Sequence, residues 1–193
     1  MAEAVRVLLL IALLAAALTF AASFFSWWME EERRLRRALR HILGGLPEAE
    51  ALSPGMGQAA GLDFDSESIA VLWNGGRSGL VFTFDELEGA ELIVDGHVSA
   101  RVRRGEARRE LDDVGAEAER VSLRLLFDDV RQPEFEQDLW SPLIRPVVAS
   151  PAEAVRLGRR WLSHVEAIIR RPRTDVGASP RSDDEELDDR NDG

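Results

Sequence analysis

The longest hydrophobic segment of the chain lies at its start. Residues 7–29, VLLLIALLAAALTFAASFFSWWM, form a run of 23 residues without a charge. As a helix this run would be about 35 Å long, against a bilayer hydrocarbon core of roughly 30 Å. It ends in Trp27 and Trp28, aromatic residues of the type enriched at membrane–water interfaces. The pattern predicts a transmembrane anchor over residues 1–29.

A cleaved signal peptide is the alternative interpretation of this segment. Arg6 would provide its charged start, and the small residues around Ala21 and Ser23 would provide a cleavage site. The apolar run is longer than the roughly 7 to 15 residues typical of a signal peptide, and bulky aromatic residues continue beyond the candidate cleavage sites. The sequence therefore favours a retained anchor.

Arginines are distributed unequally around the anchor. Arg6 precedes it, whereas five arginines follow it within about a dozen residues, and an excess of arginine marks the cytoplasmic side of a membrane segment. We therefore expect a single-pass protein of the inner (cell) membrane with its C-terminal part in the cytoplasm. The residues predicted at the membrane interface are Trp27, Trp28, Arg33, Arg34, Arg36, Arg37 and Arg40.

The basic segment that follows, residues 30–46, has a short helical pattern. Leu35, Ala38, Leu39 and Ile42 recur at helical spacing, with arginines on the remaining faces. One interpretation is an amphipathic helix that rests on anionic headgroups. The other is a charged continuation of the transmembrane helix, which the sequence favours because the apolar stripe is too short to anchor by itself.

The pattern changes twice beyond this helix. Gly44 and Gly45 end the helical spacing, and residues 47–60 are rich in Pro, Gly and Ala without a sustained period, which predicts a linker. From residue 61 the hydrophobic period becomes two, with turn residues at 74–76 and at Asp95-Gly96. This pattern predicts six or seven short strands, which include residues 69–73, 80–84, 92–94, 98–102, 121–127 and 133–140. Pro133 at its start marks the last of these as an edge strand.

A C-terminal helix is the clearest local prediction. Ser150, Pro151 and Glu153 form a capping box with proline at the first helical position. Apolar residues then recur at helical spacing until Pro172, which stops the helix. We expect this amphipathic helix to bury Trp161 against a sheet, so the predicted fold class is α+β.

This order of elements resembles that of bacterial pleckstrin-homology-like (PH-like) proteins. The stretch GLVFTFDELEGAELIVDG, residues 79–96, is similar to their step from a strand through an acidic turn into the next strand. The stretch VSLRLLFDDVRQPEFEQDLW, residues 121–140, is similar to their later strand pair with an interposed proline. The resemblance spans residues 61–172 and implies a small antiparallel sheet or barrel closed by a C-terminal helix. It also implies a binding or scaffolding module, often tethered to a membrane, with no catalytic residues to transfer. Another small barrel or split sheet capped by a helix would fit the same pattern.

Charge separates the tail from the rest of the chain. Residues 174–193 contain eight acids, two arginines and no apolar face, which predicts a disordered acidic tail over residues 173–193. The whole chain has a net charge of −11. Nucleic-acid binding needs a net basic face, so DNA and RNA are not expected partners.

Composition removes several kinds of chemistry. The chain contains no Lys, Tyr or Cys, so Schiff-base and P-loop lysines, tyrosine acids, thiolate nucleophiles and cysteine metal sites are excluded. The three histidines are scattered, and each is interpreted as a surface or hydrogen-bonded residue. We therefore predict no catalytic residue, no cofactor and no metal site, and we do not expect an enzyme.

One basic concentration lies within the predicted domain. It comprises Arg101, Arg103, Arg104, Arg108 and Arg109, and such a surface could contact acidic lipid headgroups or a partner. Acidic residues interleave with these arginines, so the favoured interpretation is a loop that neutralises itself.

These features predict a membrane-anchored, non-catalytic binding or scaffold protein with a cytoplasmic PH-like domain. Its expected partners are the lipid bilayer and another protein. The sequence does not decide whether the chain forms a homodimer, because the anchor contains no GxxxG pair. The alternative is an exported periplasmic protein with a cleaved signal peptide and an envelope-related role.

Overall fold

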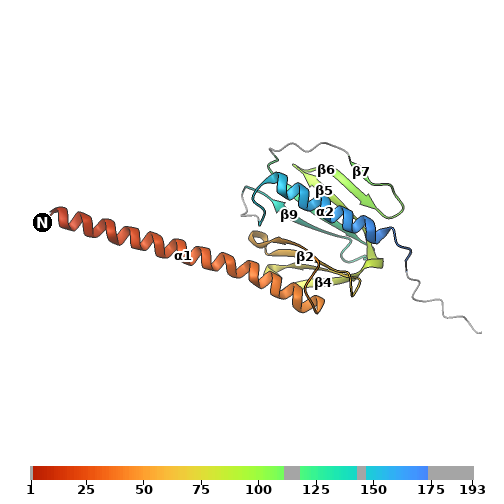
Figure 1. Cartoon of the computed structure of the whole chain (residues 1–193), viewed down its shortest axis with the longest axis horizontal. Coiled ribbons are helices and arrows are strands. Elements are labelled where there is room, and N and C mark those ends of the chain that lie inside the picture. Colours follow the sequence, from red (N-terminus) through yellow and green to blue (C-terminus); the bar gives the residue numbers. More distant parts are fainter. Residues whose placement is uncertain (1, 111–117, 143–146, 174–193) are drawn as a thin grey trace, which may run out of the picture.

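The computed structural model describes residues 2–110, 118–142 and 147–173, and at residues 2–5, 7–10 and 21–29 the description extends to the backbone only. The described residues form an α+β fold with a long N-terminal helix, two antiparallel sheets and a C-terminal helix (Figure 1). The predicted fold class is confirmed at this level.

Helix α1 (Ala2–Leu43) joins the hydrophobic run and the basic segment in one helix of 42 residues. It ends before Gly44, whose φ of +75° is left-handed, as the glycine pair predicted. Its N-terminal half extends away from the sheets, and its C-terminal part lies beside them (Figure 1). Among the described residues, no helix is both long enough and apolar enough to cross a membrane.

The first sheet is an antiparallel meander in the order β1-β2-β3-β4. Its strands are β1 (Ala49–Ser53), β2 (Gln58–Asp63), β3 (Ser68–Trp73) and β4 (Ser78–Thr83). The short 3-10 turns η1 (Pro54–Met56) and η2 (Asn74–Gly76) lie at one end of this sheet, and the turn between β2 and β3 lies at the other end.

The second sheet has the order β7-β6-β5-β8-β9 and follows the first through the 3-10 turn η3 (Phe84–Glu86). Its strands are β5 (Leu87–Val94), β6 (His97–Arg103), β7 (Arg109–Glu110), β8 (Val121–Phe127) and β9 (Glu134–Trp140). Asp95 and Gly96 both have positive φ, as a two-residue hairpin turn requires. The hairpin and the position of β9 at a sheet edge agree with the sequence-based predictions.

Helix α2 (Pro151–Ile169) closes the fold as expected. The Ser150 side chain accepts a hydrogen bond from the Glu153 backbone N–H, and Trp161 is 1% exposed. α2 packs chiefly on β5, where Gly158 allows close approach because a Cβ at this position would clash with Leu92.

Two hydrophobic clusters hold these elements together. The larger one joins the inner faces of both sheets to α2, through residues that include Leu62, Val71, Leu92, Leu123 and Trp161. The smaller cluster joins α1 to the opposite face of the first sheet. The first sheet is therefore covered on both faces.

Residues 47–60 differ most from the prediction, because they form β1, η1 and the start of β2 in place of a linker. The hydrophobic alternation there is weak since small residues occupy the positions under α1. Ala59 is fully buried, and a Cβ at Gly61 would lie 3.2 Å from side-chain atoms of both Leu39 and Leu43. With β1, β2 and the two-residue β7, the described residues contain nine strands, against six or seven predicted.

The acidic tail predicted over residues 173–193 lies outside the described residues except for Arg173. The guanidinium of Arg173 pairs with Glu88 and, at 3.2 Å, with Asp128, while its Nε donates to the Asp85 carbonyl. The described chain therefore ends against η3 and the turn after β8.

Candidate functional site

The basic segment of α1 is fixed to the first sheet by its leucines. Leu35 and Leu39 are fully buried and Leu43 is nearly so. They pack in one cluster with residues of the sheet that include Leu52 and Leu72. The apolar stripe predicted in residues 30–46 therefore lies on protein, and the interpretation in which it rests on headgroups is wrong.

The five arginines of this segment separate into two groups. Arg34 pairs with Glu31 at 3.7 Å, and Arg36 pairs with Glu32 at 2.6 Å and with Glu50 at 2.8 Å. The other three are exposed and make no ion pair among the described residues. They are Arg33, Arg37 and Arg40, which we call the arginine stripe.

The arginine stripe occupies the helix face opposite the buried leucines. Its spacing of four and three residues places its members on one face of α1. Arg37 also donates from Nε to the Arg33 carbonyl at 3.3 Å. Trp27 and Trp28 lie in α1 as predicted, but their side chains fall outside the described ones. The charges that α1 leaves unpaired thus point away from the sheet.

Two tight turns adjoin α1 at one end of the first sheet, which we call the η1–η2 end. The Gly75 N–H donates to the Gly57 carbonyl at 2.9 Å, and the Arg34 guanidinium lies beside Gly75. Gly57 has a φ of +63°, and a Cβ there would lie 2.7 Å from the Gly75 nitrogen, so both the conformation and the approach require glycine. Met56 is 49% exposed at this end.

The contacts along α1 define which way the η1–η2 end faces. Arg34, Leu35 and Ala38 adjoin η2, whereas Leu39 and Leu43 adjoin Gly61 in the middle of β2. Followed toward its N-terminus, α1 therefore leaves the sheet past the η1–η2 end, as Figure 1 also shows. The leucine stripe was visible in the sequence, but the small residues that receive it gave no hydrophobic signal.

The second predicted basic group is not gathered into one basic surface. Arg101 pairs with Glu106 at 3.3 Å, and Arg103 pairs with the nearly buried Glu91 at 3.2 Å. Glu91 also pairs with Arg124 at 3.1 Å. The hydrogen bond and ion pair of Arg124 with Glu136 raise the pKa of this guanidinium further. These charges form a paired ladder across the outer face of the second sheet.

The remaining arginines of that group connect elements. Arg104 donates to the main-chain carbonyls of Phe84 and Leu87 and to that of Ile169 at the end of α2. Arg108 lies between Glu110 at 3.1 Å and Glu166 at 3.5 Å, while Arg109 is exposed in β7. The contacts of Arg104 and Arg108 are structural.

An open hollow of about 400 Å³ adjoins these arginines. It is lined by Glu88, Arg103, Arg104, Glu106 and Leu126. Glu88 lies 3.6 Å from Arg104, and Arg103 and Glu106 are also ion-paired. The hollow therefore presents charges that are already matched within the fold.

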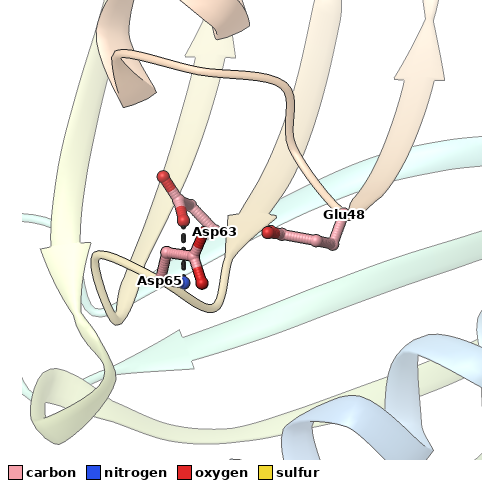
Figure 2. Close-up of side chains that lie close together, drawn as sticks. All are labelled: Glu48, Asp63 and Asp65. Carbon is pink, nitrogen blue, oxygen red and sulfur yellow. Dashed lines mark hydrogen bonds between the residues drawn. The ribbon is translucent and has the colours of Figure 1, made fainter.

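Three carboxylates meet beside the turn between β2 and β3 (Figure 2). Oxygen atoms of Glu48, Asp63 and Asp65 lie within 4.8 Å of one another, and such oxygens are ligands that hard cations prefer. Glu48 accepts the Phe64 N–H at 3.0 Å. Asp63 accepts the N–H groups of Asp65 and Ser66, and the bond from Ser66 is the main reason that its pKa lies below the usual value. Backbone hydrogen bonds thus account for the positions of Glu48 and Asp63.

Comparison with known proteins gives no relative for this site. No protein-family model matches the chain, and no curated protein or solved structure matches it.

Proposed function

We propose that this chain is a single-pass membrane protein whose α+β domain is a non-catalytic binding or scaffold module in the cytoplasm. The observation that carries the proposal is the continuity of α1. One helix contains the uncharged run at residues 7–29 and, a few residues later, the leucines buried on the first sheet. A partner bound to the domain would therefore be held close to the membrane.

The proposed anchor rests on the sequence of the whole run and on the described side chains within it. Large apolar side chains between residues 11 and 20 are exposed, for example Leu13 at 72% and Phe20 at 76%. Thr19, a polar residue in this part, donates its hydroxyl to the Ala15 carbonyl at 2.8 Å. Exposed apolar side chains and an internally bonded hydroxyl suit a helix surrounded by lipid.

The proposed orientation rests on the arginine stripe. Arg33, Arg37 and Arg40 face away from the first sheet and are free of ion pairs among the described residues, so their charge is available to anionic headgroups. Arginine after the hydrophobic run and little before it favours a cytoplasmic domain.

The PH-like assignment is also part of the proposal. The feature that supports it is the C-terminal amphipathic helix, which packs on an antiparallel sheet. The described strands form two sheets, whereas the resemblance implies one small sheet or barrel. The charged side chains across the second sheet and around α2 are largely paired with one another. This pairing favours a non-catalytic binding module over an enzyme.

The first test of the proposal is membrane retention. The full chain should stay with bacterial membranes after alkaline carbonate washing, whereas a chain that starts at Glu30 should be soluble and folded because Leu35 and Leu39 are retained. Release of the full chain by the wash would contradict the anchor.

The second test is topology. Two reporters are each fused after Gly193, one that is active only in the cytoplasm and one that is active only after export. The cytoplasmic reporter should be active and the export reporter inactive. Activity of the export reporter together with a shortened soluble product would support the alternative, an exported protein with a cleaved signal peptide. Activity of the export reporter with an intact membrane-bound chain would reverse the orientation.

A further inference from the structure

Strand β4 is the open edge of the first sheet. β4 pairs with β3 on one side, and no described strand pairs with it on the other. The opposite edge, β1, is linked to β9, since the Ser53 hydroxyl donates to the Asp138 carbonyl. The amide of Gln58, at the start of the adjoining β2, also donates to the Glu136 carbonyl at 3.3 Å. Within the described chain, β4 is therefore a six-residue open edge, although the N–H of its last residue, Thr83, donates to the Glu86 carboxylate at 2.6 Å.

This edge lacks the features that usually protect edge strands. Residues 78–83, Ser-Gly-Leu-Val-Phe-Thr, contain no charge and no proline, and their register with β3 has no bulge. Natural proteins commonly use such features to prevent pairing at an open edge. Their absence here indicates that the edge is used for pairing.

Apolar side chains are exposed on both faces of this edge. Leu80 is 40% exposed on the face of the larger core, and Val81 is 49% exposed on the face covered by α1. Ile42, at 38%, lies one helical turn after Ala38, which packs against Gly76 beside the β3–β4 turn. An added strand could bury side chains on both of its faces here.

A second copy of this chain does not fit this edge if α1 crosses the membrane, a condition that rests on the proposed function. Two antiparallel β4 strands would be related by a twofold axis perpendicular to the sheet. That rotation reverses α1, which lies along the strands between η2 and the middle of β2. The two anchors would leave in opposite directions and could not enter one bilayer.

The charges at the two ends of β4 favour one direction of pairing. Arg77 is exposed immediately before the strand, and the acidic residues Asp85 and Glu86 follow it in η3, where the Glu86 carboxylate accepts hydrogen bonds from Thr83. The sheet is antiparallel throughout. An antiparallel fifth strand would place its C-terminal end beside Arg77 and its N-terminal end beside η3.

We propose that β4 accepts an extended segment of another protein as an antiparallel fifth strand of the first sheet. The segment is apolar at alternate positions, basic at its N-terminal end and acidic at its C-terminal end. Main-chain hydrogen bonds to β4 supply affinity, and contacts with Leu80 and Val81 supply selectivity.

The test uses the full chain in lipid nanodiscs and a designed peptide, Arg-Val-Thr-Val-Thr-Val-Glu. At saturation this peptide should slow hydrogen exchange about tenfold or more at the β4 backbone amides that are not already bonded to β3 or to Glu86, as a newly paired edge requires. A peptide with the two terminal charges exchanged should bind several-fold more weakly. Slowed exchange at another strand, or none, would overturn the proposal.

Two matched variants distinguish peptide binding at the β4 edge from non-specific binding elsewhere on the chain. Val81→Lys should weaken peptide binding about tenfold, because an edge lysine opposes strand addition. Val130→Lys makes the same change at a 99% exposed position between β8 and β9 and should bind like the parent chain. Melting curves of both variants check that the fold is kept, and equal binding by the two variants would overturn the proposal.

The dependence of hydrogen exchange on protein concentration shows whether a second copy of the chain or another protein pairs with β4. Protection of β4 that rises with protein concentration in the absence of peptide would mean that a second copy occupies the edge, and the proposed partner would be wrong. Membrane retention is scored in the same samples. A retained chain that fails to bind the peptide overturns the β4 proposal alone, whereas a released chain that binds it overturns the anchor alone.

Discussion

Single glycines and alanines in the first sheet determine how closely α1 can lie. Gly61 leaves room for Leu39 and Leu43, and Gly57 allows the η1 turn to touch η2. Larger residues would have given the sequence a clearer strand pattern, but they would have pushed the helix away from the sheet. Gly57 and Ala59, which the sequence pattern placed in a linker, are thus among the residues on which helix packing depends.

A buried amide offers a prediction at the residue scale. Gln137 is 1% exposed, and neither its nitrogen nor its oxygen has a hydrogen-bond partner among the described residues. Gln137→Met keeps the volume and removes a desolvated polar group, so it should raise the free energy of unfolding by about 1 kcal/mol. Urea unfolding of the chain that starts at Glu30, followed by circular dichroism, measures this change.

Gln58→Met is the matched control for that variant. The Gln58 amide donates to the Glu136 carbonyl between the sheets, so its loss should lower the free energy of unfolding by roughly 0.5–1.5 kcal/mol. A clear destabilisation by Gln137→Met would contradict the assignment of its amide as unpartnered.

The hydrogen-bonded carboxylate of Asp63 should make the free energy of unfolding depend on pH. Hydrogen bonds from the turn, chiefly the Ser66 N–H, hold its folded pKa below the usual value of 3.8. A lowered pKa stabilises the fold above the unfolded value, and that stability is lost as the pH falls through the folded pKa. Asp63→Asn should therefore be less stable than the parent near neutral pH, and the difference should shrink below about pH 4.

Urea titrations of the parent and Asp63→Asn at a series of pH values measure this difference. Asp65→Asn is the control, because it removes a charge from the same turn without removing the acceptor of the two N–H groups. A difference between the parent and Asp63→Asn that stays constant down to about pH 3 would contradict the assigned role.

At the scale of elements, strong local signals were predicted correctly and weak ones were missed. The capping box at Ser150, the Asp95-Gly96 hairpin and the edge position of β9 each follow from local chemistry. β1 and β2 depend on a distant helix for their burial, so their own residues carry little pattern. The pairing of the arginines in β6 depends on Glu91 and Glu106, which register and loop geometry bring near.

The packing of α1 on the first sheet can be tested with one buried and one exposed residue. Leu39→Ala removes a fully buried side chain over Gly61 and should lower the free energy of unfolding by about 2–5 kcal/mol. Ile42→Ala, at a position that is 38% exposed, should cost less than about 1 kcal/mol. Urea unfolding of the chain that starts at Glu30 compares the two variants, and small, equal effects would show that α1 does not pack on the sheet in solution.

At the scale of the whole molecule, the absence of a linker changes what the proposed anchor does. Arg34, which adjoins η2, follows the uncharged run by five residues, or about 7 Å of helix. A domain packed on the same helix cannot rotate freely beneath the bilayer. We therefore expect the η1–η2 end to face the membrane and the turn between β2 and β3 to face away from it.

The most direct test places one label at each end of β2. The chain has no cysteine, so Met56→Cys and Ser66→Cys each give a single labelling site on an exposed residue, about 20 Å apart along the strand. Each fluorophore is measured in nanodiscs with and without spin-labelled headgroups. We expect strong quenching at position 56 and little at position 66. Equal quenching at both positions, or stronger quenching at 66, would contradict the proposed placement of the domain.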